Sequence, residues 1–293
     1  MKVVFVFIDG VGRGNKNKET NPIYATKTLT LARLIDEAAF YADAALGVEG
    51  LPQSATGQTS IFTGINAPAV LNRHMSGQPT ATLREIIYRT NIFGELIKMG
   101  LKVDSSNVYR EEYLARMLDM TDRRSRPSVT SVMGMAANIK FKTVSSFIKD
   151  AGVYHDITGE ILKGSGYDVE TVTPEKAAQN LYKLSRQNDF TLFEHFMTDI
   201  AGHTANMNEA VRVIEKLDCF LEELIGLMDF EEDVLIITSD HGNIEDSTVP
   251  THTMNKVPVI ILGKKAEAVN MHISSLVDIM PFVLKLFSQN IVC

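Results

Sequence analysis

Short apolar runs alternate along the chain with segments in which apolar residues recur every three or four positions. Runs rich in β-branched and aromatic residues predict buried strands, whereas the longer spacing predicts helices. Regular alternation of the two is typical of an α/β fold with a mainly parallel sheet flanked by helices. The predicted strands cover residues 2–8, 101–108, 191–197, 234–238 and 257–262.

The predicted helices cover residues 29–40, 83–99, 208–228 and 274–287, and Pro281 is expected to kink the last of them. The segment 208–228 carries apolar residues at helical spacing, which predicts one face packed on the core. A further helix is expected to start after Gln53 and to end at Thr63-Gly64.

The middle of the chain, residues 109–172, has weaker periodicity than its flanks. It contains a basic loop around Arg123 to Arg126, a Met-rich stretch and a Gly-rich stretch. We therefore predict a catalytic core formed by residues 1–108 and 173–293, with 109–172 as a short insertion or cap over the site.

Composition narrows the possible partners. A net charge of −7 over 293 residues argues against a nucleic-acid-binding role, because Lys and Arg supply most affinity for phosphate backbones. No apolar run has the roughly 20 residues that a membrane span needs, and no secretory signal is visible. We expect a cytoplasmic protein. A small phosphorylated substrate stays possible, since bound metal ions reverse the local charge.

Acidic and histidine side chains follow the ends of predicted strands, where ligands bind in open α/β sheets. The group consists of Asp9, Asp199, Asp240 and His241, joined by His203 one helical turn after Asp199 and by His252 in a later loop. Three converging carboxylates would repel each other strongly. A pair of divalent cations removes that penalty, and mixed Asp/His ligation suits zinc or manganese.

Ser54 precedes a predicted helix, whose N-terminus favours a bound anion or an alkoxide. A metal ion would lower the pKa of its hydroxyl further and make it a nucleophile at neutral pH. The nearby hydroxyls of Thr56, Thr59 and Ser60 are alternatives that the residues alone leave open.

These motifs resemble the alkaline phosphatase superfamily, most closely its branch of cofactor-independent phosphoglycerate mutases and phosphopentomutases. The resemblance rests on Ile8-Asp9-Gly10, Ser54-Ala-Thr-Gly-Gln58, Asp199-x-x-x-His203, Asp240-His241-Gly-Asn243 and Thr251-His252-Thr253. It implies an alkaline-phosphatase-like fold with one metal ion on Asp199, His203 and His252. A second ion would lie on Asp9, Asp240 and His241, and Ser54 would contact the metals and attack phosphorus.

The chain departs from this branch at two points. Gln58 stands where the mutases usually have His, and the insertion is much shorter than their cap. The resemblance therefore implies a two-metal hydrolase of phosphate esters that acts through a phosphoserine. A phosphomutase, with intramolecular phosphotransfer, and a non-catalytic metal-binding protein are the alternatives.

Substrate-binding residues are harder to predict than ligands. Arg123, Arg124 and Arg126 are candidates for a substrate anion because guanidinium groups bind anions with two parallel hydrogen bonds. His74 resembles a substrate-contacting histidine of the mutases by its position after the nucleophile helix. His155 is expected to be a loop residue without a catalytic role.

Overall fold

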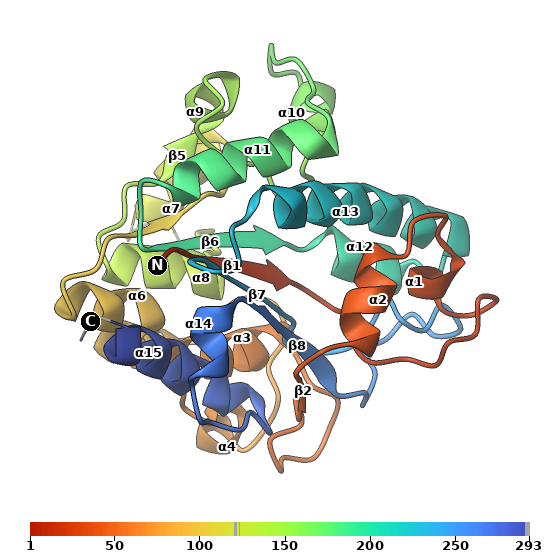
Figure 1. The fold of residues 1–293 in the computed structure, drawn as a ribbon, viewed down its shortest axis with the longest axis horizontal. Coiled ribbons are helices and arrows are strands. Elements are labelled where there is room, and N and C mark those ends of the chain that lie inside the picture. Colours follow the sequence, from red (N-terminus) through yellow and green to blue (C-terminus); the bar gives the residue numbers. More distant parts are fainter. Residues whose placement is uncertain (120–121, 123, 291–293) are drawn as a thin grey trace.

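The computed structural model describes residues 1–119, 122 and 124–290, and a six-stranded sheet lies at its centre (Figure 1). The strand order is β2-β8-β7-β1-β6-β3. All neighbouring pairs from β7 to β3 are parallel, and only β8 runs against its neighbours. The predicted mainly parallel α/β fold is thus confirmed. The strands are β1 (Val3–Ile8), β2 (Phe40–Ala42), β3 (Val103–Ser105), β6 (Phe190–His195), β7 (Val234–Thr238) and β8 (Val257–Leu262).

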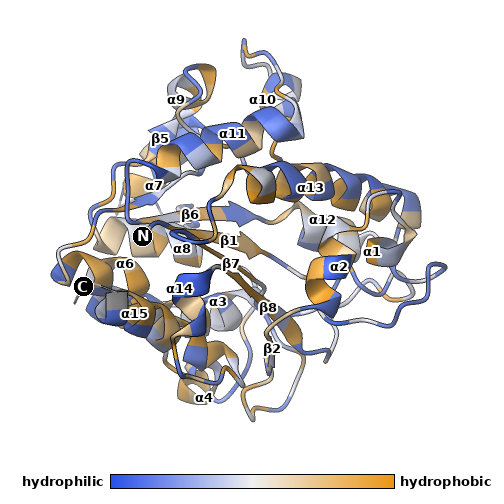
Figure 2. Cartoon of the chain, viewed as in Figure 1, coloured by the Kyte–Doolittle hydropathy of each residue, from blue (hydrophilic) through white to orange (hydrophobic). Residues whose placement is uncertain are grey.

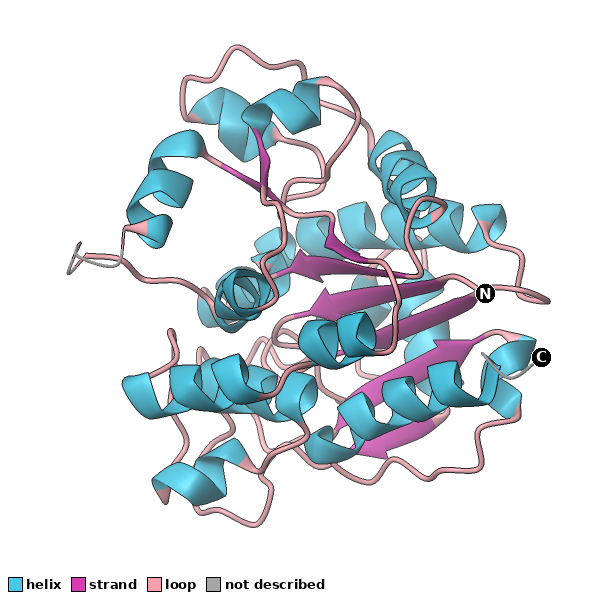
Figure 3. Ribbon diagram, turned by 90° about the vertical axis from the view of Figure 1, so that its left-hand side faces the viewer, coloured by secondary structure: helices cyan, strands magenta, loops and turns pink. Residues whose placement is uncertain are grey.

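Helices cover both faces of the sheet (Figures 1 and 3). Val3, Phe5 and Phe7 of β1 point into one apolar cluster, and Val4, Val6 and Ile8 point into the other. A strand buried on both faces has no polar alternation, which explains why β1, β7 and β8 appear as mainly apolar runs in Figure 2. The first cluster is covered by α3 (Ser54–Thr63), α5 (Ala81–Arg89), α6 (Ile92–Lys98), α8 (Val129–Ala136) and α15 (Ile279–Asn290). The second is covered by α1 (Pro22–Ala25), α2 (Thr30–Asp36), α11 (Pro174–Ser185), α12 (Met197–His203) and α13 (Met207–Leu227).

The segment predicted as an insertion divides into two parts. A two-stranded parallel sheet of β4 (Val108–Tyr109) and β5 (Lys142–Thr143) shares a small apolar cluster of its own with α9 (Val144–Ile148) and α10 (Glu160–Gly164). The helix α7 (Glu111–Leu118) follows β4. The helix α8 instead packs in the main core, where Val129, Val132 and Met133 are buried. That residues 109–172 act as a cap stays a prediction. Shorter elements complete the fold: α4 (Ala67–Leu71), α14 (Lys264–Glu267) and the 3-10 helix η1 (Leu276–Asp278).

Several predicted boundaries were wrong for local reasons. The expected helix 83–99 is two helices, because Asn91 caps a new helix by accepting a hydrogen bond from the Gly94 N–H at 2.9 Å. The expected helix 29–40 ends early, and Phe40 begins an edge strand. Pro281 does not kink the last helix, since it lies in the first turn of α15, where no N–H donor is needed. Two expected strands also differ: 101–108 is split between β3 and β4, and 191–197 gives way to α12 at Met197.

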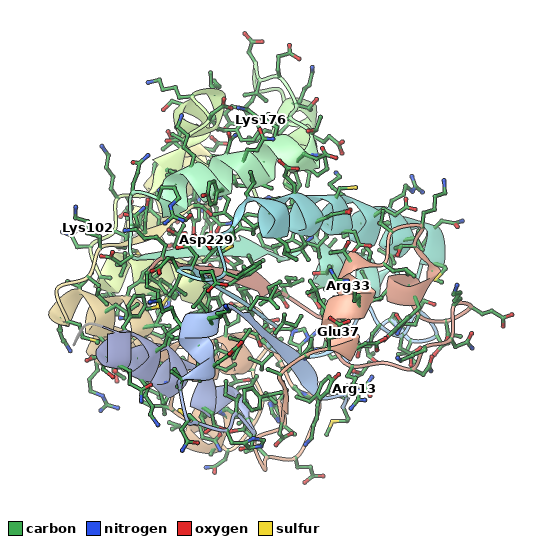
Figure 4. All side chains as sticks on the ribbon, in the orientation of Figure 1. Arg13, Arg33, Glu37, Lys102, Lys176 and Asp229 are labelled. Carbon is green, nitrogen blue, oxygen red and sulfur yellow. The ribbon has the colours of Figure 1, made fainter. Side chains whose placement is uncertain are left out.

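Many charged side chains lie at the outside of the molecule, as for Arg33 and Glu37, which pair at 3.5 Å along α2 (Figure 4). Within the described part of the chain, no helix combines the length and the apolar character needed to cross a bilayer.

Candidate metal centre and active site

The candidate ligands meet at the carboxyl ends of three adjacent parallel strands. Asp9 follows β1, α12 with Asp199 follows β6, and Asp240 and His241 follow β7. The register pairs Ile8 with His195 on one side and Phe7 with Thr238 on the other, so the three strands end at the same level. Gly10 has φ +73°, and a Cβ there would lie 2.9 Å from the Asp199 Cα. Only glycine lets α12 approach β1 this closely.

Two groups of side chains have the spacing of a metal site, and His241 belongs to both. The first group joins Asp9, Asp240 and His241: the His241 Nε2 lies 3.3 Å from Asp9 Oδ1 and 3.5 Å from Asp240 Oδ2. Two ligand atoms on one tetrahedral zinc ion lie about 3.4 Å apart, since each bond is about 2.1 Å. The distances therefore match those of atoms that share one ion.

The second group joins Asp199, His252 and His241, with His203 at its edge. Oδ1 of Asp199 lies 3.4 Å from the His252 Nε2, and Oδ2 lies 3.4 Å from the His203 Nε2. The Nε2 atoms of His203 and His252 are 3.2 Å apart, and the rings of His241 and His252 stack at 3.7 Å. The structure therefore brings all six predicted Asp and His ligands together.

Backbone carbonyls orient the histidine rings. The Nδ1–H of His252 donates to the Pro52 carbonyl at 2.7 Å, and that of His203 donates to the Pro250 carbonyl at 2.9 Å. With the proton on Nδ1, each Nε2 keeps a lone pair that faces the other ligands. Metal-binding histidines are held in this way.

The electrostatics of the site favour a positive charge beside these carboxylates. Burial, followed by the charges of Asp240 and Asp199, raises the pKa of Asp9 well above its ordinary value. Its buried Oδ1 has no hydrogen-bond partner among the described residues. Burial also acts to raise the pKa of Asp199, but hydrogen bonding to His252 and the nearby histidines outweigh it and lower the pKa to about 2. A carboxylate that must otherwise hold a proton suits a divalent cation, so the residues fit one.

Gln58 occupies the space between two of these carboxylates. It is buried in the second turn of α3, and its Nε2 donates to Asp9 Oδ2 at 3.0 Å and to Asp240 Oδ2 at 3.2 Å. These bonds partly neutralise the repulsion between the two groups and leave Asp9 Oδ1 facing His241. Gln58 thus orients the first group of ligands.

Ser54 is the first residue of α3, and its Oγ lies 3.0 Å from the His241 Nε2. The rival hydroxyls are buried and directed elsewhere. Each bonds a backbone carbonyl of the same segment: Thr56 that of Gln53, Thr59 that of Ala55 and Ser60 that of Thr56. Among these four hydroxyls, only that of Ser54 is directed at the candidate ligands.

Glu245 is a buried residue that the sequence analysis missed. Its carboxylate accepts from the backbone N–H groups of Gly12 and Asn243, and from the side chains of Thr253 and Asn255, at distances between 2.5 and 3.0 Å. These bonds join the loops that carry Asp240, His241 and His252. The Asn243 amide in turn donates to Asp199 Oδ1 at 2.7 Å. No spacing signal distinguishes Glu245 from a surface glutamate, since one of its partners, Gly12, lies in a loop at the other end of the chain.

A cavity of about 440 Å³ opens beside Asp9, Ser54 and Asp199. Its lining also includes residues of the middle segment and the two residues that precede it, none of which the sequence analysis selected for the site. These are Asn107, Val108, Tyr109, Arg110, Tyr113, Ser128, Ser131, Tyr154 and His155. Glu194 also lines the cavity; burial raises its pKa to about 7, against the effect of a 2.5 Å hydrogen bond from the Thr130 hydroxyl.

The predicted substrate-binding residues have different positions. Arg126 lines the cavity, whereas Arg124 is exposed and bonds Asp122 with two nitrogens at 3.0 and 2.9 Å. Arg123 lies outside the described residues. His74 is absent from the described cavity lining, and its Nε2 lies 3.2 Å from the Val48 carbonyl oxygen.

The candidate ligands at the strand ends and the serine at a helix N-terminus form an arrangement that suits a metalloenzyme. Residues 1–291 match the family model of the Metalloenzyme superfamily, and the chain belongs to that superfamily. The resemblance inferred from the motifs is thereby confirmed.

Curated relatives are 2,3-bisphosphoglycerate-independent phosphoglycerate mutases. The one from Serratia proteamaculans is 33% identical over 165 residues, which cover 50% of this chain and 31% of the relative. The one from Antithamnion sp. is 31% identical over 135 residues, which cover 43% of this chain and 25% of the relative. The matched region therefore spans about a third or less of these mutases.

Solved structures share the fold over nearly the whole chain. The cold-active alkaline phosphatase from a psychrophilic Shewanella sp. superposes with a TM-score of 0.59 at 13% identity, covering 98% of this chain and 99% of that one. The PH0037 protein from Pyrococcus horikoshii gives a TM-score of 0.58 at 16% identity, covering 98% and 97%. At such identities the likeness establishes the fold alone.

Proposed function

We propose that this protein is a metal-dependent hydrolase of phosphate esters that acts through a covalent phosphoserine at Ser54. The observation that carries the proposal is the 3.0 Å contact between the Ser54 Oγ and the His241 Nε2, because His241 belongs to both groups of candidate ligands. A metal site that only stabilised the fold would not require a hydroxyl at this point, which speaks against the non-catalytic alternative.

The proposed ligands are Asp9, Asp240 and His241 for one cation, and Asp199, His203 and His252 for the other. We expect zinc or manganese, since both accept mixed carboxylate and imidazole ligation. When bound, the cations would lower the pKa of the Ser54 hydroxyl and neutralise the oxygens of the transferring phosphoryl group.

The reaction takes two steps on this chain's residues. The Ser54 oxygen attacks phosphorus, the bond from phosphorus to the ester oxygen breaks, and the leaving alcohol takes up a proton. Water then attacks the phosphoserine, phosphate leaves, and Ser54 regains its proton. The N-terminus of α3 places a partial positive charge beside Ser54, which favours the anionic phosphoryl group in both steps.

A phosphomutase is the second candidate, and the names of the curated relatives favour it. In that reaction the dephosphorylated substrate stays bound and takes the phosphoryl group back at another oxygen. It requires a cavity that excludes water while the phosphoserine exists. Tyr109, Tyr113 and Tyr154 line the cavity, but the resemblance to the mutases implies a much larger cap than the middle segment of this chain can form.

One experiment separates these candidates. Purified protein is supplied with zinc or manganese and a panel of phosphate monoesters and diesters, and both free phosphate and phosphorylated isomers are quantified. A hydrolase releases free phosphate; a mutase yields an isomer without net release. Mass spectrometry of acid-quenched enzyme should place the phosphoryl group on Ser54. Absence of all three products with both metals would contradict the proposed function.

A further inference from the structure

The cavity extends well beyond the group that would be transferred. Asp9, Ser54 and Gln58 line one end, whereas Arg110 and His155 line it from the middle segment of the chain. A volume of about 440 Å³ is within the range of small-molecule sites. The part of the cavity formed by the middle segment is therefore available to the leaving group of a substrate.

Arg110 contributes a positive charge to this cavity. It occupies the N-cap position of α7, and no hydrogen bond or close ion pair holds its guanidinium within the described part of the chain. The neighbouring Glu112 accepts a hydrogen bond from the Tyr167 hydroxyl, and Arg110 acts on that carboxylate only through its charge. By contrast, Arg124 and Arg186 each form a bidentate ion pair with an aspartate. A guanidinium without such a partner, facing a cavity, suits an anion on a ligand.

His155 adds a neutral donor beside this charge. Its ring contacts those of Tyr154 and Phe196, with centroids 4.1 and 4.2 Å away, so its orientation is fixed. Its Nδ1 is buried without a hydrogen-bond partner among the described residues. Burial, reinforced by the charges of His195 and Arg110, lowers the pKa of His155 to about 3. The imidazole is therefore uncharged at neutral pH and does not repel the guanidinium.

Apolar side chains continue the same wall. Phe196, which stacks on His155, and Ile200, which is 46% exposed, flank Asp199 on the cavity side of α12. A carbon skeleton can pack on them while its polar groups reach Ser54 at one end and the middle segment at the other.

We propose that Arg110 and His155 form a second anion subsite, which binds a carboxylate or phosphate group on the leaving-group part of the substrate. The inference rests on the proposed function for the phosphoryl end of the cavity. It assigns recognition to Arg110 in place of Arg124, whose guanidinium is already paired. The substrate class is a phosphate ester with two anionic groups separated by a short carbon skeleton.

Calorimetry with non-hydrolysable phosphonates tests the subsite without requiring turnover. Metal-loaded protein is titrated with phenylphosphonate, with 4-carboxyphenylphosphonate and with 1,4-phenylenebisphosphonate. We expect at least one of the doubly anionic compounds to bind about tenfold tighter than phenylphosphonate, since a charge-assisted bidentate contact is worth that much. The tighter of the two identifies the preferred anionic group, and equal tightness would mean that the subsite accepts both.

Four variants make the test specific. Arg110→Met should abolish the tenfold preference and leave phenylphosphonate affinity unchanged, and Arg110→Lys should restore part of the preference. His155→Phe, which keeps the ring packing but removes the donor, should reduce the preference severalfold. Arg124→Met is the matched control and should bind all three compounds like the wild type.

The experiment distinguishes failure of the anion subsite from failure of the proposed function. If wild-type protein binds all three phosphonates equally well, or if the preference survives Arg110→Met, the subsite does not exist and the proposed function stands. If no phosphonate binds to the metal-loaded protein, the proposed function at Ser54 is contradicted. The anion subsite, which rests on that function, is then contradicted as well.

Discussion

The side-chain amide of Gln58 donates a hydrogen bond of 3.0 Å to Oδ2 of Asp9. The same nitrogen bonds Oδ2 of Asp240 at 3.2 Å, so one neutral donor holds two buried carboxylates side by side. A histidine at this position could gain or lose a proton, whereas an amide cannot. The first group of candidate ligands is therefore arranged by a partner whose charge does not change with pH.

Gln58→Met should weaken metal binding at the first group. It removes the donor to two carboxylates at similar side-chain size, and loss of such a partner around a metal site typically costs about 10- to 100-fold in affinity. Competition with a chromogenic chelator measures the effect. Gln179→Met, on the exposed face of α11 beside Glu223, makes the same change far from the site and should leave metal affinity unaltered. Equal affinities for the two variants would show that Gln58 does not orient the ligands.

We predict that two divalent cations bind per chain and stabilise the fold. At a free metal concentration about 100-fold above Kd, each ion adds about 2.7 kcal/mol by mass action, which raises Tm by several degrees. Elemental analysis should find more than one equivalent, and chelation should lower Tm. His241→Ala should reduce binding of both ions because His241 belongs to both groups, whereas His203→Ala should affect one. A Tm that changes with neither added metal nor chelator would contradict this prediction.

The ligands could be found from the sequence because parallel strands end at one edge of the sheet. Asp9, Asp199 and Asp240 each follow an apolar run, so predicting the strands also predicted that these residues would meet. The same reasoning could not find Arg110 and His155, which reach the cavity through the packing of the middle segment. Glu245 was missed for a similar reason, since it joins Gly12, more than two hundred residues away, to its nearer partners Asn243, Thr253 and Asn255.

The predicted ends of helices and strands were wrong where a single side chain determines them. Asn91 ends one helix and caps the next, although the apolar spacing continues through it. The strand at Phe40 pairs only with β8, so its existence depends on a partner more than two hundred residues away. The spacing of apolar residues indicates which face of an element is buried, but it does not indicate where a capping residue ends that element.

Ser54→Ala should abolish turnover and preserve the fold. The hydroxyl contacts His241, so its loss removes the nucleophile but leaves the carboxylate and imidazole ligands in place. We expect a decrease in kcat on the order of a thousandfold or more, with metal still bound. Thr59→Ala is the matched control: its buried hydroxyl bonds the Ala55 carbonyl, so its removal should cost about 1 kcal/mol of stability with little change in kcat. Near-normal turnover of Ser54→Ala would exclude the phosphoserine route.

Asp218 should make the stability of the fold depend on pH. It lies buried on α13 and accepts hydrogen bonds from the Leu31 N–H and the Thr28 hydroxyl, at 2.8 and 2.9 Å. Burial is the largest influence and raises its pKa from 3.8 to about 6. The folded protein therefore holds this proton more tightly than the unfolded chain does. The resulting stabilisation is fully present below pH 3.8 and is lost as the pH rises to about 6.

Asp218→Asn removes this titration and keeps an acceptor for the Leu31 N–H. The free energy of unfolding of the variant, minus that of the wild type, should thus increase by about 2 kcal/mol between pH 4 and pH 7. Urea unfolding at both pH values, with chelator present so that metal binding does not contribute, measures the difference. Asp168→Asn changes an exposed aspartate and should show no comparable increase. A difference for Asp218→Asn that stays constant from pH 4 to pH 7 would mean that the carboxyl group titrates alike in the folded and unfolded chains.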